Sequence, residues 1–224
     1  MKLIDPKYEF IFVGDGMEAL KRIETIARTC YKSEDTDSDD ERTKRFVKGL
    51  ITRGHDAMLE HSMLSVRFTV ARGIANEIVR HRHFSFAQES TRYCKYSGEV
   101  EFIKPFWYEK ATFNDKMIFE ESLVNAEATY QALLDNGHTA QEAREALPHA
   151  LKTEIVVTGN YREWRHFMKL RAANSTGPAH PDMNRIMCPL LIELHERIPV
   201  IFDDIYEEML NDPHAAKYIE SYKI

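Results

Sequence analysis

Residues 80–93, which read RHRHFSFAQESTRY, concentrate the side chains in this chain best suited to chemistry. Three arginines, two histidines and two serines fall within these fourteen residues, although the net charge of the whole chain is -6. An arginine guanidinium can donate two parallel hydrogen bonds to the oxygens of a phosphate or carboxylate, and serine hydroxyls supply further donors. The segment, which we expect to be a turn and loop, therefore predicts a site for a small anionic ligand. For residues 80–83 alone, the basic end of a helix is the simpler alternative.

A second polar cluster lies in residues 160–171, which read NYREWRHFMKLR. Helical spacing places Arg162, His166 and, one turn further on, Lys169 or Leu170 along one side of a helix. An exposed basic helix is the alternative interpretation, but Trp164 and Phe167 argue against full exposure.

The first cluster resembles the signature of the flavin-dependent thymidylate synthases. Arg80-His81-Arg82 is followed by seven residues and then Ser90, and Arg92 and Tyr93 come next as they do in that family. The second cluster is similar to a family pattern that runs from Asn160 to Arg171. The resemblance implies an enzyme that reductively methylates dUMP to dTMP, with 5,10-methylenetetrahydrofolate as carbon donor, FAD as redox carrier and NADPH as reductant. It also implies a reaction without a covalent protein nucleophile, and Cys188, which precedes a proline, carries no sign of activation.

The resemblance assigns roles to residues by position. It makes Arg171 the catalytic residue, because a cation there would stabilise negative charge developing on the uracil ring. For Arg144 it implies a contact with the nucleotide phosphate of a neighbouring subunit, with a surface ion pair to Glu145 as the alternative. The predicted dUMP-binding residues are Glu77, Arg80, Gln88, Glu89, Ser90, Thr91, Arg92, Arg144 and Arg171. The predicted FAD-binding residues are Arg80, His81, Arg82, Asn160, Arg162 and His166, and those on the folate side are His55, Ser85 and Tyr93.

Three features depart from the family pattern. Glu77 stands where glutamine is common, Glu89 stands where relatives usually have an apolar residue, and residues 174–182 form a divergent loop. If only the backbone of residue 89 contacts the ligand, little changes, whereas a carboxylate facing phosphate would lower affinity. The departures leave open a flavin- and folate-dependent hydroxymethyltransferase acting on a pyrimidine nucleotide. A non-enzymatic nucleotide- or RNA-binding protein is the alternative from another class.

Hydrophobic periodicity predicts the elements that position these residues. Apolar and polar residues alternate over 64–70, which predicts a half-buried strand, and a helix is predicted over 72–79. These rigid elements lead directly into the first cluster and would hold it in place. The pattern Gly14-x-Gly16-x-x-Ala19 imitates a dinucleotide fingerprint, but the polar stretch 31–42 supplies no second strand and favours a plain turn. Further predicted strands cover 8–13, 99–103 and 153–158. Further predicted helices begin after Gly16 and cover 40–53, 113–135 and 140–147, and a closing helical region over 187–205 is predicted to break near Pro199.

Composition limits the classes of partner and the cellular compartment that the chain suggests. The isoelectric point near 5.9 argues against a general nucleic-acid surface, and three widely spaced cysteines indicate a reducing compartment. We find no membrane span or signal sequence and expect a cytoplasmic protein. We predict no metal site, because His55, Glu60 and His61 match no zinc spacing and the alternating Asp35, Asp37 and Asp39 lack the glycine and glutamate of a calcium loop.

Length and resemblance together predict the architecture. The 224 residues suit a single domain, 1–224, of the α+β class, with a central mixed or antiparallel sheet and packed helices, as in flavin-dependent thymidylate synthases. The resemblance implies a homotetramer in which subunits share active sites.

Overall fold

The computed structural model describes residues 1–30, 32–33 and 39–222, so Asp35 and Asp37 lie outside the described residues. The chain divides into two compact units. The first unit comprises Met1–Glu9, Arg67–Arg80 and Phe86–Val156, and the second comprises Phe10–Val66, His81–Ser85 and Val157–Ile224. That residues 1–224 act as a single domain stays a prediction.

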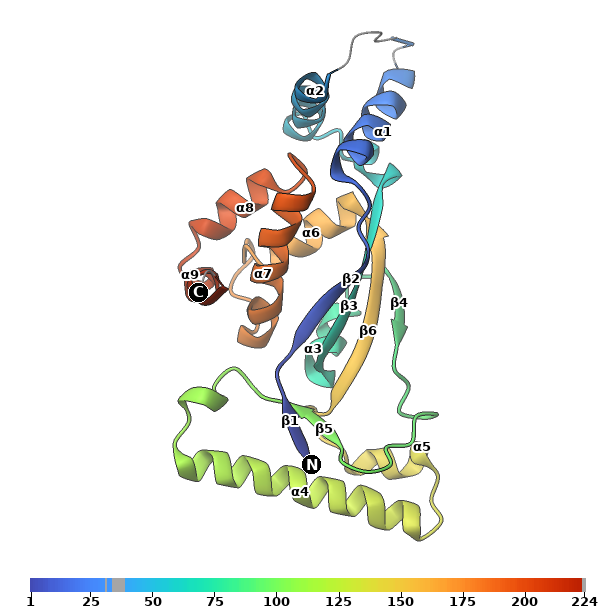
Figure 1. Cartoon of the computed structure of the whole chain (residues 1–224), viewed down its shortest axis with the longest axis vertical. Helices are drawn as coiled ribbons and strands as arrows, with labels where there is room; N and C mark the ends of the chain where they lie inside the picture. The colour runs from blue at the N-terminus through green and yellow to red at the C-terminus, as the bar shows by residue number, and fades with distance from the viewer. Residues whose placement is uncertain (31, 34–38, 223–224) are drawn as a thin grey trace. The chain divides into compact units, whose positions relative to one another are not determined.

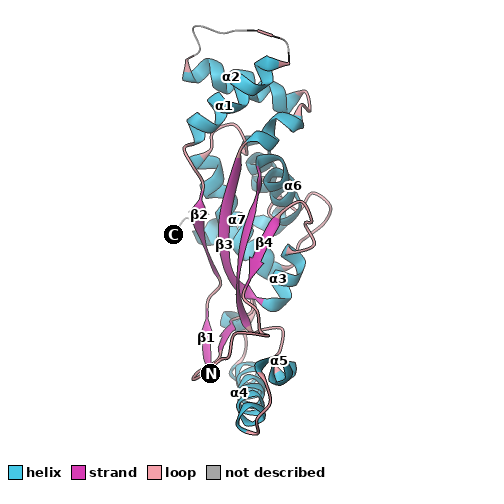
Figure 2. Ribbon diagram, turned by 90° about the vertical axis from the view of Figure 1, so that its right-hand side faces the viewer, coloured by secondary structure: helices cyan, strands magenta, loops and turns pink. Residues whose placement is uncertain are grey.

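Strands and helices mix in the way that the α+β class requires, which confirms the predicted class. A four-stranded sheet has the order β2 (Lys7–Phe12), β3 (Met63–Ala71), β6 (Lys152–Asn160), β4 (Ser85–Gln88), and Figures 1 and 2 show its strands side by side. The strand β4 corrects the expectation that residues 80–93 are only turn and loop. The exposed Ser85 and Ala87 alternate with the more buried Phe84, Phe86 and Gln88, which is the spacing that a short strand requires.

The prediction that residues 64–70 form a half-buried strand is wrong about burial. Both faces of β3 are covered, since Ser65 and Thr69 are buried along with Leu64, Val66 and Phe68. The hydroxyls of Ser65 and Thr158 lie 2.8 Å apart, so the polar group of Ser65 keeps a hydrogen-bond partner inside the protein.

The first unit combines a strand pair with helices. β1 (Lys2–Ile4) pairs in parallel with β5 (Glu101–Ile103), and α3 (Arg72–Ile78) follows β3. The long helix α4 (Phe113–Asp135) has the predicted bounds, because Thr112 caps its first turn and Gly137 ends it with a φ of +91°. The predicted helix over 140–147 is shorter: α5 (Ala140–Ala143) passes into a 3-10 turn, η3 (Arg144–Ala146), before Pro148, which disfavours helix in the residue before it. A second 3-10 turn is η2 (Tyr108–Lys110).

The second unit is mostly helical. α1 (Gly16–Thr29) begins at the turn that the glycines predicted, where the Asp15 carboxylate accepts a hydrogen bond from the Glu18 amide at 2.9 Å. The predicted start of a helix at residue 187 is wrong, since α7 begins at Pro181, a residue that suits the first turn of a helix. The remaining elements are α2 (Asp40–Thr52), η1 (Asp56–His61), α6 (Tyr161–Arg171), α7 (Pro181–Arg197), α8 (Asp203–Leu210) and the unpredicted α9 (Pro213–Tyr222). Figure 1 shows α6, α7 and α8 close together.

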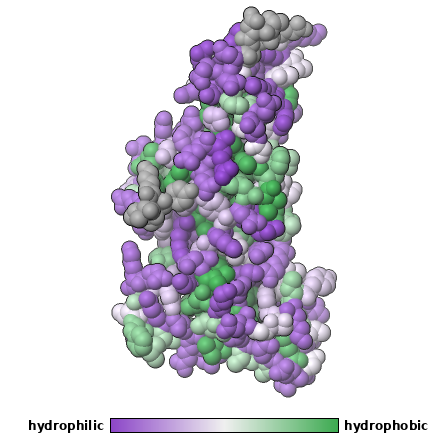
Figure 3. All heavy atoms as spheres, viewed as in Figure 1, coloured by the Kyte–Doolittle hydropathy of each residue, from purple (hydrophilic) through white to green (hydrophobic). Residues whose placement is uncertain are grey.

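The helices differ in the polarity of their exposed side chains, since α4 exposes the apolar Phe113, Met117, Ile118 and Val124. Over α1 and α2, the face drawn in Figure 3 is mostly hydrophilic, in keeping with a charged fraction of 29%. Within the described residues, no helix is long and apolar enough to cross a membrane.

Candidate active site

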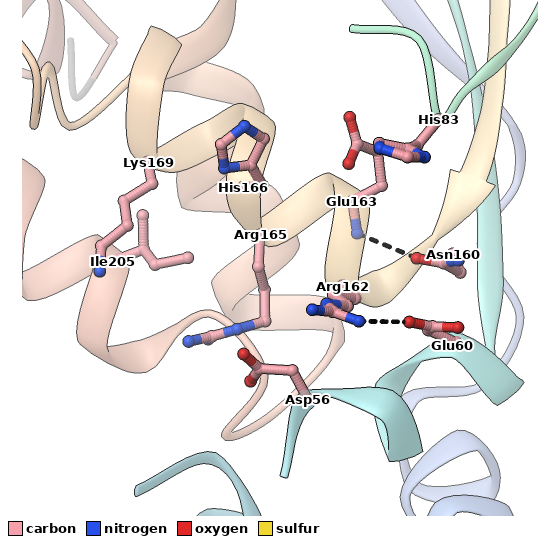
Figure 4. A pocket seen from close by; sticks show the side chains of 10 residues that line it. All are labelled: Asp56, Glu60, His83, Asn160, Arg162, Glu163, Arg165, His166, Lys169 and Ile205. Carbon is pink, nitrogen blue, oxygen red and sulfur yellow. Dashed lines mark hydrogen bonds and ion pairs between the residues drawn. The ribbon is translucent and has the colours of Figure 1, made fainter. Parts of the chain in front are cut away.

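The helix α6 carries the second polar cluster and has two faces. Its inner face buries Trp164 and Phe167 completely, and the Trp164 indole donates a hydrogen bond to the Leu64 carbonyl at 3.2 Å. Its outer face presents Arg162, His166 and Lys169, as the helical spacing predicted (Figure 4). The buried aromatic side chains fix the position of the helix and thereby the direction of its polar residues.

A cavity of about 610 Å³ opens over this outer face. The Asn160 side chain caps α6 by accepting a hydrogen bond from the Glu163 amide at 2.9 Å. In Figure 4, His83 lies beside the Glu163 carboxylate, whose pKa is raised by burial despite the opposing effects of His166, His83 and Arg162. The cavity is lined by Asp56, Glu60, His83, Asn160, Arg162, Glu163, Arg165, His166, Lys169 and Ile205.

The arginines at this cavity differ in how firmly they are held. Arg162 forms an exposed ion pair with Glu60 at 2.6 Å, which costs little to rearrange because both groups reach solvent. Arg165 is held by both carboxylate oxygens of Asp204 at 2.7 Å, and its exposed fraction is only 13%. We therefore interpret Arg162 as available to a ligand and Arg165 as structural.

Arg171 and His81 form the second feature of this unit. The Arg171 Nε donates to the His81 Nε2 at 3.1 Å, so this nitrogen of His81 carries no proton. Burial, together with the positive charge of Arg171 and the neighbouring His166, lowers the pKa of His81 to about 4. His81 is therefore neutral at pH 7 and orients the arginine by accepting its hydrogen bond.

Aromatic packing holds the segment around His81 in place. The Phe84 ring lies 4.8 Å from the Trp164 ring and 5.4 Å from the Phe167 ring, measured between centroids. The His81 ring meets Phe167 edge-on at 4.5 Å. The start of the signature is thus anchored to α6 by apolar contacts.

The low pKa of His81 predicts a pH dependence of folding. Above pH 6.5 the residue contributes no pH dependence, because it is neutral in the folded and the unfolded chain. Between pH 6.5 and about 4 the unfolded chain takes up a proton that the folded protein does not, so stability falls with pH. The loss is at most about 3 kcal/mol. Chemical unfolding of wild type and His81→Asn across this range measures it, and the variant should lose less stability than wild type as the pH falls.

The exposed His61 provides the matched control for this measurement. We expect His61→Asn to retain the pH dependence of wild type. Equal slopes for wild type and His81→Asn would contradict a buried neutral His81.

In the first unit, the signature ends in a tight turn. The amides of Tyr93 and Cys94 donate to the Ser90 carbonyl at 3.1 and 2.8 Å, and the Ser90 hydroxyl accepts from the Arg92 amide at 3.3 Å. Arg144 donates to the buried Thr91 hydroxyl at 3.2 Å and also lies 3.5 Å from Glu145. Two residues predicted to bind dUMP are thus brought together, and the predicted alternative pair with Glu145 forms as well.

The side chains of Gln88 and Glu89 turn toward β6. Gln88 donates to Thr153 at 3.4 Å, while the Glu89 carboxylate accepts from Lys152 at 3.2 Å and from Tyr96 at 3.0 Å. The carboxylate that departs from the family pattern is therefore neutralised within the protein.

Comparison with known proteins identifies the family. Residues 13–200 match the family described as "Thymidylate synthase complementing protein". The chain belongs to this family. It is 33% identical over 216 residues to a flavin-dependent thymidylate synthase of Corynebacterium aurimucosum, covering 86% of this chain and 85% of that protein. It is 32% identical over 227 residues to the flavin-dependent thymidylate synthase of Mycobacterium tuberculosis, covering 94% and 88%.

Solved structures support the fold. A UMP/dUMP methylase, PolB from Streptomyces cacaoi, bound with 5-Br dUMP, gives a TM-score of 0.77 at 20% identity over 92% of this chain and 97% of that one. The same protein bound with 5-Br UMP gives 0.74 at 18% identity, over 93% and 97%. The resemblance to flavin-dependent thymidylate synthases, the assignment as an enzyme and the flavin dependence are thus confirmed by the family.

The site residues predicted for this chain divide between the two compact units. The second unit contains every predicted FAD residue except Arg80, and it also contains the predicted catalytic Arg171. The first unit contains the other dUMP residues, among them Glu77 and the exposed Arg80 and Arg92. On the predicted folate side, His55, Ser85 and Tyr93 are all exposed, and the exposed fraction of Tyr93 is 79%.

Sequence reasoning missed several residues of the candidate site. His83, Glu163 and Arg165 line the cavity, and Lys152 and Tyr96 hold Glu89. The sequence offered a signal for two of them, since Glu163 and Arg165 lie within one turn of the predicted His166. Within the described ranges, no group of three or more His, Cys, Asp or Glu residues could hold a metal ion.

Proposed function

We propose that this chain reductively methylates dUMP to dTMP, using 5,10-methylenetetrahydrofolate as the carbon donor, FAD as the flavin and NADPH as the reductant. The family supports the reaction class, and the structural neighbour PolB is a UMP/dUMP methylase. We further propose a cytoplasmic homotetramer with shared active sites, in keeping with the predicted resemblance.

The pairing of Arg171 with a neutral His81 is the observation that carries this proposal. C5 of uracil is a poor nucleophile, and negative charge must develop on the ring as it reacts. A positive charge held in a preorganised position stabilises such a transition state without reorganisation during the reaction. His81 fixes the Nε edge of Arg171 at 3.1 Å and, being neutral, does not repel the guanidinium.

The cavity over α6 suits a phosphate-bearing cofactor. Its rim carries Arg162, His166 and Lys169, and the ion pairs that hold Arg162 and Lys169 are exposed, at 2.6 and 3.9 Å. Such pairs exchange for phosphate oxygens at little cost. We propose that these three residues and Asn160 hold FAD, which when bound supplies the redox chemistry. The protein contributes binding and orientation of the ligands.

The proposed dUMP site takes its donors from the turn at residues 90–93. The Ser90 and Thr91 hydroxyls of this turn, with the side chains of Arg92, Arg80 and Arg144, are of the kind that hold a phosphate dianion. Arg144 contacts Thr91 of its own chain, and in the proposed tetramer its side chain would reach the nucleotide phosphate of a neighbouring subunit.

The state of Cys188 supports a reaction without a covalent protein nucleophile. This cysteine is fully buried in α7, and burial raises the pKa of its thiol to about 12. A thiol in this environment is inert, because the thiolate is the nucleophilic form.

Mass spectrometry of the nucleotide product tests the proposed function. Protein loaded with FAD is mixed without oxygen with dUMP, methylenetetrahydrofolate and NADPH, and each is omitted in turn. We expect dTMP only when all are present. A hydroxymethylated nucleotide would instead establish the hydroxymethyltransferase alternative, and binding of flavin without any nucleotide product would overturn the proposed reaction.

A further inference from the structure

The Glu89 carboxylate is the centre of a polar network in the first unit. Its Oε1 accepts from the Tyr96 hydroxyl at 3.0 Å, and its Oε2 accepts from Lys152 Nζ at 3.2 Å and from the Glu154 amide at 3.3 Å. The Glu89 amide also donates to the Glu154 carbonyl at 2.9 Å. Only 16% of the Glu89 side chain and 17% of the Lys152 side chain is exposed. An ion pair this protected from solvent is screened far less by salt than a surface pair.

These contacts close a loop. The hydrogen bond between Glu89 and Tyr96 joins the two ends of residues 90–95, which include the turn proposed to bind phosphate. Tyr96 is itself held, since its amide donates to the Tyr130 hydroxyl at 3.2 Å and its carbonyl accepts from Gln131 at 3.0 Å. Burial, and then the charge of Glu89, raises the pKa of Tyr96, so its hydroxyl remains a donor. Glu89 precedes the loop and binds Tyr96, which follows it, so the Glu89 carboxylate holds the two ends of the loop together.

A carboxylate beside a phosphate-binding turn would ordinarily weaken phosphate binding, because like charges repel strongly where solvent is scarce. Lys152 removes this conflict by placing its ammonium against Glu89. Its other carboxylate neighbours, Glu101 and Glu154, are more distant at 3.9 Å, so Glu89 is its principal partner.

We propose that Lys152 is a positioning residue of the dUMP site, which neutralises Glu89 so that this carboxylate can anchor the 90–95 loop without repelling the phosphate. The inference rests on the proposed function, since it assumes that the loop receives the phosphate of dUMP. It assigns a purpose to the acidic residue that departs from the family pattern.

Equilibrium dialysis with dUMP and with deoxyuridine tests this role at pH 8, where an unpaired carboxylate stays ionised. For Lys152→Met, we expect the Kd of dUMP to rise on the order of tenfold, and that of deoxyuridine by less than about twofold, because only dUMP carries the repelled charge. For Glu89→Gln, which removes the negative charge and keeps the shape, we expect the Kd of dUMP to stay within about twofold or to fall. A loss of dUMP affinity in Lys152→Met without a matching loss in Glu89→Gln would not arise from a purely structural role of the ion pair.

Lys2→Met is the matched control. Lys2 borders the same small cavity as Lys152, and it pairs with Glu101 at 3.1 Å rather than with Glu89. We expect its dUMP affinity to equal that of wild type.

Three results would overturn the inference. The first is wild-type affinity for dUMP in Lys152→Met. The second is an equal loss of affinity for dUMP and for deoxyuridine in that variant. The third is a selective loss of affinity for dUMP in Glu89→Gln. The last remains decisive even if Lys152→Met does not fold. Failure of the wild type to bind dUMP would overturn the proposed function as well, whereas the variant results alone would leave that function standing.

Discussion

Arg171→Ala is expected to lower kcat on the order of a thousandfold, about 4 kcal/mol of transition-state stabilisation, while FAD still binds. The positive charge is needed mainly when charge develops on the pyrimidine, so its removal should affect turnover much more than ligand binding. Steady-state kinetics and flavin absorbance measure the two effects separately. Turnover equal to that of wild type would exclude the catalytic role of Arg171.

The pKa of His81 provides a second measurement on the same variant. Burial and the charge of Arg171 both depress its pKa, with burial the larger cause, so removing the arginine should raise the pKa from about 4 toward 6.5 without reaching it. Nuclear magnetic resonance of the His81 ring measures this shift. Arg185→Ala, which removes another arginine of the second unit, paired with Asp182 at 3.3 Å, is the control and should leave both kcat and His81 unchanged. An unchanged pKa of His81 in Arg171→Ala would contradict the observed contact.

Gly159→Ala is expected to lower the free energy of unfolding by about 3 kcal/mol. A Cβ at this position in β6 would overlap the Phe84 ring, which is 6% exposed and wedged against Trp164 and Phe167. Because the interior is close-packed, the ring cannot move without displacing its neighbours. Displacement of Phe84 should also disturb His81, only three residues earlier in the chain. Chemical denaturation measures the loss of stability.

Two further variants show whether the steric conflict is the cause. Adding Phe84→Leu to Gly159→Ala should recover about 1 kcal/mol relative to additive effects, because the smaller side chain makes room. Gly49→Ala is the control within a helix, where the new Cβ meets only the flexible end of Arg53, at 3.2 Å. It should leave stability unchanged or raise it by less than about 1 kcal/mol. Additive effects of the two substitutions at Gly159 and Phe84 would contradict the proposed overlap.

Local signals in the sequence were sufficient for much of the fold. Thr112 and Gly137 fixed the ends of α4, and the spacing of Arg162, His166 and Lys169 placed them on one face of α6. Such signals depend on residues within a few positions of one another. The errors arose where burial depends on tertiary packing, as in β3, where Ser65 and Thr69 are buried together with the apolar residues.

The sequence by itself determined the family signature, the identities of the candidate residues and most of the elements that carry them. Only the tertiary structure decided their chemical states. His81 is neutral because folding buries it against Arg171, 90 residues away, and Glu89 is neutralised by Lys152, 63 residues away. Desolvation and charge pairing depend on distances in space, which spacing along the chain does not specify.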